Sequence, residues 1–409
     1  MNSSAIRGVA TVAMVIGIGS LARAAPPGTA EIPEGETVVP YVYGGELYDS
    51  NLFRVSGDDE ARDKLGTTDT SEWISRAGAG VRSAIPVSLQ TFRFDGWVER
   101  NHYRDFDTLN HTATDLNGAW DWQLGRLWEG TLDLGYSRQL SSFDELQEIQ
   151  RDMKRGRRAS LDAGLRVTPD WEVIGGAGWR DTDHDERDQL DRQETWASGE
   201  IRYHTPVDTR VGLRAKVTEG DMANRELLPD GTLVSNDYEE TEYSVVVGWE
   251  GSVKSDLEGR FGYTRRDYDE RTQRDFQGFT SRVDYRWRAT AKTTLNVAVW
   301  RELETLNDEV SSYVDSRGVR LKPVWQATPK TSLYALLDYR RQIFDGAQGT
   351  GTDNAGREDN VRTAGLGVGY EALRNLRLHV DASGGRRDSN VDSNDYRYRQ
   401  VFAGLTYAF

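Results

Sequence analysis

The sequence contains no cysteine, so it uses no disulfide bonds even in a compartment that would permit them. After residue 24 it also lacks any apolar run approaching the roughly 20 residues of a membrane-spanning helix. A helical membrane protein is therefore excluded. Histidine is scarce, with five in the chain, and no serine has a convincing histidine partner in the sequence pattern. An enzyme is not expected, because nucleophilic catalysis needs such a partner.

Positive charge is scarce relative to negative charge. The chain has 51 Lys and Arg against 66 Asp and Glu, a net charge of -15. Nucleic acid is therefore not an expected partner, since such proteins are normally basic. Neither a cofactor nor a metal site is expected. Asp388, Asn390, Asp392 and Asn394 alternate like the oxygen ligands of a calcium loop, but without its turn glycine and closing glutamate, which favours a solvated hairpin loop.

The start of the chain has the pattern of an export signal. Arg7 precedes a short apolar run and a small-x-small sequence that ends at Ala24. This pattern predicts a secretory signal peptide at residues 1–24, cleaved after Ala24, rather than an uncleaved anchor. Residues 25–37 are rich in proline and glycine and too short to fold alone, so we expect a short periplasmic extension. The remaining residues, 38–409, form the predicted folded unit.

Apolar and polar residues alternate along most of this unit. In "NLRLHVDAS", residues 375–383, leucine, valine and alanine alternate with arginine, histidine and aspartate. Side chains alternate across a β-strand, so each such segment has one apolar face and one polar face. A soluble β-sandwich would show the same alternation, with the apolar face as its core.

The connections between these segments distinguish a barrel from a sandwich. Short turns recur about every 40 residues, and longer polar stretches lie between them, as in outer-membrane barrels. The short turns are predicted at 84–87, 124–127, 168–171, 205–210, 251–255, 289–294, 327–332 and 372–375. Eight hairpins with an opening and a closing strand predict an all-β fold, a transmembrane antiparallel β-barrel of about 18 strands with short periplasmic turns and long extracellular loops.

Tryptophans cluster beside the short turns, which supports the barrel. Tryptophan and tyrosine prefer the membrane interface, where an apolar ring meets hydrated headgroups. In a sandwich, the tryptophans would instead lie in the middle of the core. The predicted girdle comprises Trp120, Trp122, Trp128, Trp171, Trp249, Trp287 and Trp325.

The last nine residues, "VFAGLTYAF", alternate and end on a phenylalanine. In a closed barrel this strand must pair with the first one, because an open edge cannot face lipid. We expect a lipid-facing row of Val401, Ala403, Leu405, Tyr407 and Phe409. A terminal aromatic residue on such a strand resembles the signal read by the barrel-assembly machinery of Gram-negative bacteria, with Phe409, Tyr407 and Leu405 as its residues. The expected location is the outer membrane, with outer-membrane lipid as surroundings.

The polar faces should line the lumen, and their charges are unevenly distributed. Early strands contribute a predicted acidic wall: Asp95, Glu99, Asp115, Asp121, Glu129 and Asp133. Later strands contribute a predicted basic wall: Arg210, Arg214, Lys216, Arg260, Arg266, Arg282, Arg286, Arg288, Arg320 and Lys322.

Two interpretations of these walls stay open. One is a transverse field whose basic side guides anionic solutes. The other is that the charges pair across strands and keep the wall hydrated. Arg282, Arg286 and Arg288 share one face with a single carboxylate, Asp284, which cannot neutralise all three. We therefore expect a pore that prefers anions.

The segment Pro40–Gly57 has a Pro-aromatic strand start and leaves it through a distinct motif: Tyr48, Asp49, Asn51, Phe53 and Arg54. It resembles the opening of the EpsL-type porin family of outer-membrane β-barrel proteins, which are encoded in exopolysaccharide-biosynthesis operons. The rest of the chain matches that family only in architecture. The resemblance implies a role in moving an extracellular polysaccharide through the outer membrane, and it brings no catalytic residues.

Three functions remain open at this stage. The first is a polysaccharide export pore, and the second is a diffusion porin for small anionic or saccharide solutes. The third is a sealed structural or adhesive barrel whose loops do the work. Single-channel conductance would separate the third from the first two.

Overall fold

The computed structural model describes residues 37–409 except 145, 208, 228–230, 305–312 and 346–355. The predicted signal peptide and nearly all of the predicted periplasmic extension lie outside the described residues. Eighteen strands form one continuous antiparallel sheet that closes on itself, and a two-stranded hairpin lies in one of the connecting loops. The predicted all-β barrel of about 18 strands is confirmed.

The first nine barrel strands are β1 (Val38–Asp49), β2 (Glu72–Val87), β3 (Gln90–Tyr103), β4 (His111–Leu124), β5 (Trp128–Leu140), β6 (Met153–Arg166), β7 (Trp171–His184), β8 (Arg192–His204) and β9 (Thr209–Met222). The other nine are β12 (Tyr238–Ser252), β13 (Ser255–Tyr268), β14 (Phe276–Thr290), β15 (Thr293–Glu304), β16 (Tyr313–Thr328), β17 (Thr331–Asp345), β18 (Glu358–Leu373), β19 (Leu376–Ser389) and β20 (Tyr396–Ala408).

Strands β10 (Glu226–Leu227) and β11 (Leu233–Val234) form the loop hairpin, and α1 (Asp58–Leu65) lies in the loop after β1. Four short 3₁₀ helices occupy other loops: η2 (Asp107–Leu109), η3 (Asp188–Leu190), η4 (Thr272–Arg274) and η5 (Asp392–Asn394). No helix among the described residues has both the length and the apolar character needed to cross a membrane.

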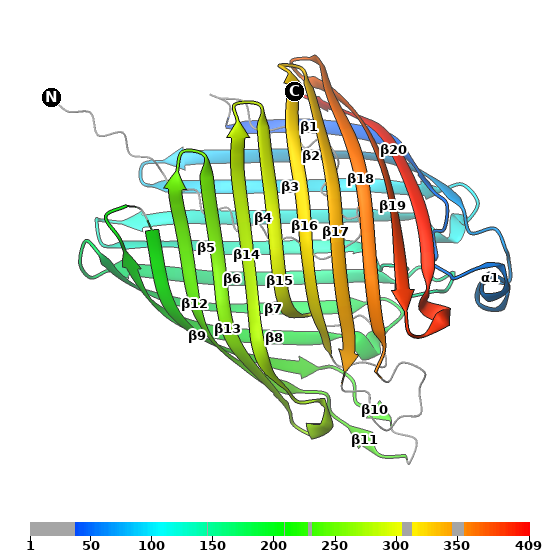
Figure 1. The fold of residues 1–409 in the computed structure, drawn as a ribbon, viewed down its shortest axis with the longest axis horizontal. Coiled ribbons are helices and arrows are strands. Elements are labelled where there is room, and N and C mark those ends of the chain that lie inside the picture. Colours follow the sequence, from blue (N-terminus) through cyan, green and yellow to red (C-terminus); the bar gives the residue numbers. More distant parts are fainter. Residues whose placement is uncertain (1–36, 145, 208, 228–230, 305–312, 346–355) are drawn as a thin grey trace.

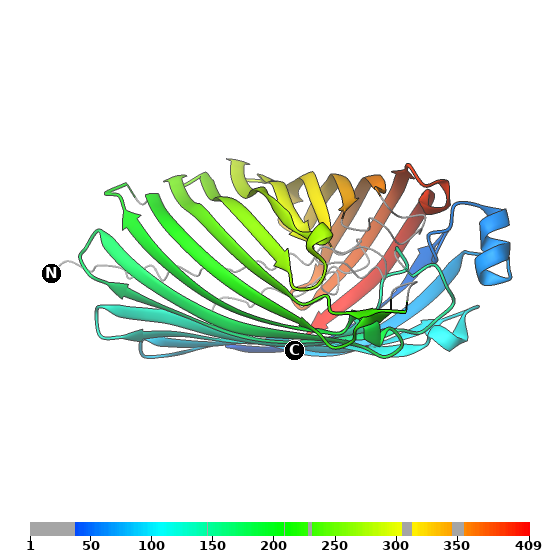
Figure 2. The same cartoon turned by 90° about the horizontal axis from the view of Figure 1, so that it is seen from below.

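The barrel closes where the first strand meets the last. Tyr41 lies opposite Ala408 and Asp49 lies opposite Gln400, and the amide of Phe409 donates to the carbonyl of Pro40 at 2.9 Å. Strands β12–β19 cross steeply in front of β1–β8 (Figure 1). The wall curves strongly when seen from below (Figure 2). A barrel of eighteen strands encloses a lumen too wide to fill with the side chains of its wall alone.

Alternation along each strand separates an inner face from an outer face. In β1, Tyr41 and Tyr43 are buried inside while Val42 is exposed outside. The inward tyrosine rings lie across glycines of β2, where a Cβ on Gly80 would be 2.4 Å from the Tyr41 ring. Glycine is required at such a close approach because any side chain would clash with the ring.

The outer face carries the aromatic girdle that the sequence predicts. Six of the tryptophans beside the short turns are exposed large side chains: Trp120, Trp128, Trp171, Trp249, Trp287 and Trp325. The final strand places Val401, Leu405 and Phe409 on the exposed face, and Phe409 is 68% exposed. Phe402 and Thr406 alternate with them and are buried. Their arrangement is that of a lipid-facing row with its aromatic end at the membrane interface.

One predicted turn is wrong in position. We expected a turn at residues 84–87, but β2 continues through Val87 and the turn consists of Ser88 and Leu89. Proline suggested a turn at this point. The neighbouring β1 begins opposite Ser83, so Pro86 lies beyond the end of that neighbour, where a strand tolerates proline.

Candidate functional site

The loop between β5 and β6 reaches across the outer end of the lumen. The backbone carbonyl of Asp144 accepts a hydrogen bond from Arg387 of β19 at 2.8 Å. The hydroxyl of Tyr396, at the start of β20, donates to the Asp144 carboxylate at 3.3 Å. Phe143 packs edge-on against Phe53 from the first loop, with ring centres 4.9 Å apart. This loop therefore narrows the channel from the extracellular side.

A buried ion pair in the first loop supports the β5–β6 loop. Arg54 contacts the Asp49 carboxylate through both terminal nitrogens, at 3.0 and 2.9 Å, and both side chains are almost fully buried. Its guanidinium lies 3.9 Å from the centre of the Tyr398 ring. Burial alone would lower the pKa of Arg54, but Asp49 and Asp144 outweigh it and raise that pKa. Arg54 is therefore charged at every physiological pH.

These contacts give the family-motif residues a structural role. Phe53 is fully buried in a cluster with Leu52 and Leu109. Asn51 donates to the carbonyl of Val55 at 2.8 Å. The first loop is thereby packed into the mouth of the barrel.

A second ion pair fixes the base of the β5–β6 loop. The Asp152 carboxylate accepts from Ser141 at 2.7 Å and from Arg187 at 2.8 Å, and its residue is fully buried. Burial alone would raise the pKa of Asp152, but these two donors outweigh it and lower the pKa. The loop is thus held at its base as well as at its tip.

A cavity of about 540 Å³ lies beside this loop inside the outer half of the barrel. Ser142 and Asp144 of the loop border it, and the strands β6–β9, β12–β15 and β17–β20 supply the rest. Its wall contains eight cations: Lys154, Arg180, Arg192, Lys216, Arg260, Arg266, Arg340 and Arg387. It contains six carboxylates: Asp144, Glu194, Glu240, Glu242, Glu302 and Glu304. Cations therefore exceed carboxylates by two.

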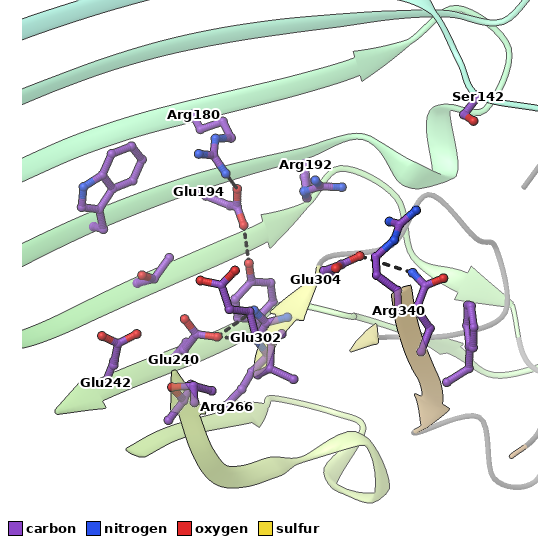
Figure 3. Close-up of a pocket in the computed structure, with 18 of the residues that line it drawn as sticks. Ser142, Arg180, Arg192, Glu194, Glu240, Glu242, Arg266, Glu302, Glu304 and Arg340 are labelled. Carbon is purple, nitrogen blue, oxygen red and sulfur yellow. Dashed lines mark hydrogen bonds and ion pairs between the residues drawn. The ribbon is translucent and has the colours of Figure 1, made fainter. Parts of the chain in front are cut away.

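Most of these charges are paired. Figure 3 shows Arg180 pointing to Glu194, and Arg266 beside Glu240. The Arg180–Glu194 distance is 3.4 Å, and the Arg266–Glu240 distance is 2.7 Å. Arg260 bridges two carboxylates, Glu242 at 3.1 Å and Glu302 at 2.8 Å. Pairing of this kind lowers the field that each charge exerts in the lumen.

Two cations of the cavity wall make no ion pair with any described residue: Arg192 and Lys216. The Nε of Arg192 is buried without a hydrogen-bond partner. The ammonium of Lys216 lies 5.4 Å from the centre of the Trp196 ring. These two residues therefore present positive charge in the cavity wall without a carboxylate partner among the described residues.

The structure places all ten residues of the predicted basic wall on inward-facing strand positions, but it pairs most of them. The premise that one carboxylate faces three arginines is wrong. Arg282 contacts Glu302 as well as Asp284, and Arg286 and Arg288 contact Asp256. These partners come from β13 and β15, whose position beside β14 the sequence pattern alone did not resolve.

The remaining members divide in the same way. Arg320 pairs with Asp338 at 2.7 Å, and Arg210 lies 3.6 Å from Glu250. Arg214 and Lys322, like Lys216, make no ion pair with a described residue. Of the predicted basic wall, only Lys216, Arg260 and Arg266 line the cavity.

The six residues of the predicted acidic wall also occupy inward positions. Asp95 pairs with Arg82 at 2.7 Å, Asp121 pairs with Arg93 at 2.6 Å, and Glu129 lies 3.8 Å from Arg166. The other three make no ion pair within the described part of the chain: Glu99, Asp115 and Asp133. The acidic wall therefore includes cations that pair with its carboxylates, just as the basic wall includes carboxylates that pair with its cations.

A closed barrel with a loop-narrowed, charge-lined lumen and an aromatic girdle is the arrangement of a porin, and a family comparison decides the matter. The family described as "Putative beta-barrel porin 2" matches residues 182–409, more than half of the chain. The chain belongs to this family. It is a porin-like β-barrel of the outer membrane. No curated protein matches it.

Solved structures with a similar outline come from Pseudomonas aeruginosa. OccK1 (OpdK) is 11% identical with a TM-score of 0.49, covering 91% of this chain and 99% of that chain. OccK5 (OpdH) is 10% identical with a TM-score of 0.46, covering 91% and 98%. A mutant of the ferric enterobactin receptor PfeA is 10% identical with a TM-score of 0.46, covering 92% and 82%.

Several residues of this porin's cavity escaped the sequence analysis. Arg180, Arg192, Arg340 and Arg387 lie near the extracellular ends of their strands, where loop and strand were hard to separate in the sequence. The inward position of Trp196 was not predicted either, because tryptophans in such a sequence are typical of the lipid-facing belt. A signal was present, since Trp196 lies well away from the short turns and lies opposite Gly178 across the neighbouring strand.

Proposed function

We propose that this barrel is a selective channel for small anionic solutes, saccharides among them. The observation that carries the proposal is the pair of unpaired cations, Arg192 and Lys216, in the wall of the narrowed cavity. Each such charge lowers the energy of an anion in contact with it by about 1 kcal/mol in bulk-like water, and more where the lumen narrows. The local field decides permeation, so the net charge of the whole chain does not oppose it.

Saccharides fit the same wall. Trp196, which is half-buried, places an aromatic ring 5.4 Å from the Lys216 ammonium. A carboxylated sugar presents an apolar ring face and an anionic group, which match an aromatic ring with a cation beside it. Arginine adds planar, two-point recognition of a carboxylate.

The test compares two double variants in planar bilayers under a salt gradient. Arg192→Gln with Lys216→Gln removes two charges inside the cavity. Arg286→Gln with Arg288→Gln removes two charges outside it, near the turn between β14 and β15. We expect the wild type to prefer anions and the first variant to lose up to about thirtyfold of that preference, because two contact charges contribute about 2 kcal/mol together.

The control variant should keep most of the preference. A cation-selective wild type would contradict the proposal. Equal losses in the two double variants would also contradict it, because the cavity charges would then have no special role.

Export of an extracellular polysaccharide is a second candidate function, favoured by the resemblance of Pro40–Gly57 to the exopolysaccharide-operon barrels. The residues of that motif hold the first loop against the β5–β6 loop, the element that would have to move for a long chain to pass. The test is secretion of polysaccharide by cells that lack the gene, with re-expression as the control. Unchanged secretion in the deletion strain would exclude this candidate and leave the solute channel standing.

A further inference from the structure

Four outward-facing arginines lie together on the exterior of the last three strands. Arg362 of β18 is opposite Arg386 of β19, and Arg386 is opposite Arg397 of β20. Arg399 follows on the same face of β20, and all four side chains are exposed. Like charges directly opposite each other in neighbouring strands are destabilising. An anion bound between these groups would remove that repulsion.

This row has little negative charge of its own. Asp388 contacts Arg386 and lies 3.6 Å from Arg362. In the part of the chain that the structure describes, the side chains of Arg397 and Arg399 make no ion pair or hydrogen bond with the protein. Arg362, Arg386, Arg397 and Arg399 are called the exterior arginine row below.

Three exterior arginines on other strands have carboxylate partners. Arg157 of β6 lies 3.0 Å from Asp181, and Arg265 of β13 lies 2.8 Å from Asp267. Arg301 of β15 lies 2.8 Å from Asp315. The exterior arginine row differs from these pairs because its four arginines share one nearby carboxylate among the described residues, Asp388. The row is confined to strands β18–β20.

The row lies directly above the apolar band. Arg399 is opposite Gly384, which is opposite Ala364. The next outward row toward the short turns is apolar and exposed, with Leu366 and Val401. The arginines therefore lie on the extracellular side of the boundary between headgroups and acyl chains, where basic residues attract anionic lipid groups.

A shallow groove runs beneath the row. Its volume is about 550 Å³, and it is lined by the four arginines together with Val319, Leu321, Leu337 and Tyr339. Ala364 and Gly384 form its floor, because neither has a side chain large enough to fill the space. The surface thus combines basic groups at the headgroup level with an adjoining apolar groove.

We propose that this surface binds a phosphorylated, multiply acylated glycolipid of the outer leaflet, of the lipid A type. The phosphate groups accept hydrogen bonds from Arg386, Arg397 and Arg399, since the guanidinium fork matches phosphate geometry. The acyl chains lie in the groove and over Leu366 and Val401. A second copy of this chain fits less well, because a two-fold contact would place the same arginines against one another.

The experiment measures binding to the purified full-length barrel in detergent by native mass spectrometry. The probes are phosphorylated lipid A, the same lipid with its phosphates removed, and inorganic phosphate. The variants are Arg397→Gln with Arg399→Gln, and Arg155→Gln with Arg157→Gln as a matched pair of exterior arginines on β6 that have carboxylate partners. A heat-modifiable band on a gel establishes that each variant is folded.

We expect the wild type and the β6 control to bind phosphorylated lipid A, and the β20 variant to bind it roughly thirtyfold more weakly, since each of the two interfacial arginines contributes about 1 kcal/mol. Dephosphorylated lipid A should bind weakly to all three proteins. Equal binding by the wild type and the β20 variant would overturn the proposal, as would equal binding of the dephosphorylated lipid to the wild type. Inorganic phosphate that binds as tightly as phosphorylated lipid A and displaces it would overturn the assignment to a lipid, because the acyl chains would then contribute nothing to binding. If the β20 variant does not fold, the comparison of the two lipids on the wild type still decides.

Discussion

The outer end of the barrel differs between its two arcs: a large apolar cluster fills one, the packed arc, whereas smaller aromatic clusters and charged side chains line the other, the open arc. From β1 to β5 and at β20, the first loop and the β5–β6 loop form an apolar cluster that includes Phe53, Tyr103 and Phe402. From β6 to β19, the lumen surface carries charged side chains around the cavity. Apolar burial gives stability where water is expelled, whereas charges are tolerated where water remains. The packed arc positions the constriction, and the open arc sets what can pass it.

The largest expected effect concerns the ion pair of the packed arc. Arg54→Ala leaves the Asp49 carboxylate buried without its partner, which should lower the free energy of unfolding by ~3–5 kcal/mol. Arg286→Ala removes a half-exposed pair on β14, a strand of the open arc, near its short turn, and should cost about 0–1 kcal/mol. Denaturant unfolding in detergent, followed by tryptophan fluorescence, measures both. Similar costs for the two variants would mean that the two arcs do not differ as described.

The second prediction asks whether the packed arc sets the size of the channel. Asp144→Ala with Arg387→Ala removes side-chain contacts between the β5–β6 loop and strands β19 and β20. The loop should leave the lumen more often, so single-channel conductance should rise and fluctuate more. Arg138→Ala is the control, because it breaks an exterior ion pair with Asp185 at the same end of β5. A conductance unchanged by the double variant would show that this loop does not limit the flow.

The sequence was sufficient for the barrel but not for the constriction. Period-two alternation and recurrent short turns are local signals, so they predict strands, their number and the outward Trp120 and Phe409 without knowledge of the partners. Whether Arg282 is neutralised depends instead on which residues lie opposite it on neighbouring strands. That register also depends on turn lengths, and a one-residue error reverses the face of every side chain.

The inward fold of the β5–β6 loop could not be predicted from the sequence, for a different reason. In the sequence, the segment between β5 and β6 has the composition of an ordinary polar loop. Its residues Asp144 and Gln147 are partly or fully buried, but the residues that they contact are far away in the chain. Arg54 and Arg387 lie 90 residues before and 243 residues after Asp144. Nothing local distinguishes a loop that folds inward from one that extends into solvent. The motif from Tyr48 to Arg54 was visible, but its role as a support for that loop was not.

The smallest expected effect is a pH dependence of opposite sign in two loop carboxylates, Asp152 at the base of the β5–β6 loop and Asp191 before β8. Donors to Asp152 lower its pKa, so its contribution to stability is present above the pKa of the unfolded chain and is lost as pH falls through the folded value. Burial raises the pKa of Asp191 to about 6, reinforced by Asp183 and Asp188 and opposed by the amide of His184. Its ionisation therefore destabilises the fold progressively as pH rises from about 4 to 6.

Relative to the wild type, Asp191→Asn should gain thermal stability over that interval, whereas the loss caused by Asp152→Asn should shrink only under more acidic conditions. The midpoint of the heat-modifiable transition, measured at a series of pH values, reports both trends. Parallel pH profiles for the two variants would show that the two carboxylates occupy equivalent environments, contrary to the contrast between Asp152, which is paired with Arg187, and Asp191, whose donors are the amide and a ring nitrogen of His184.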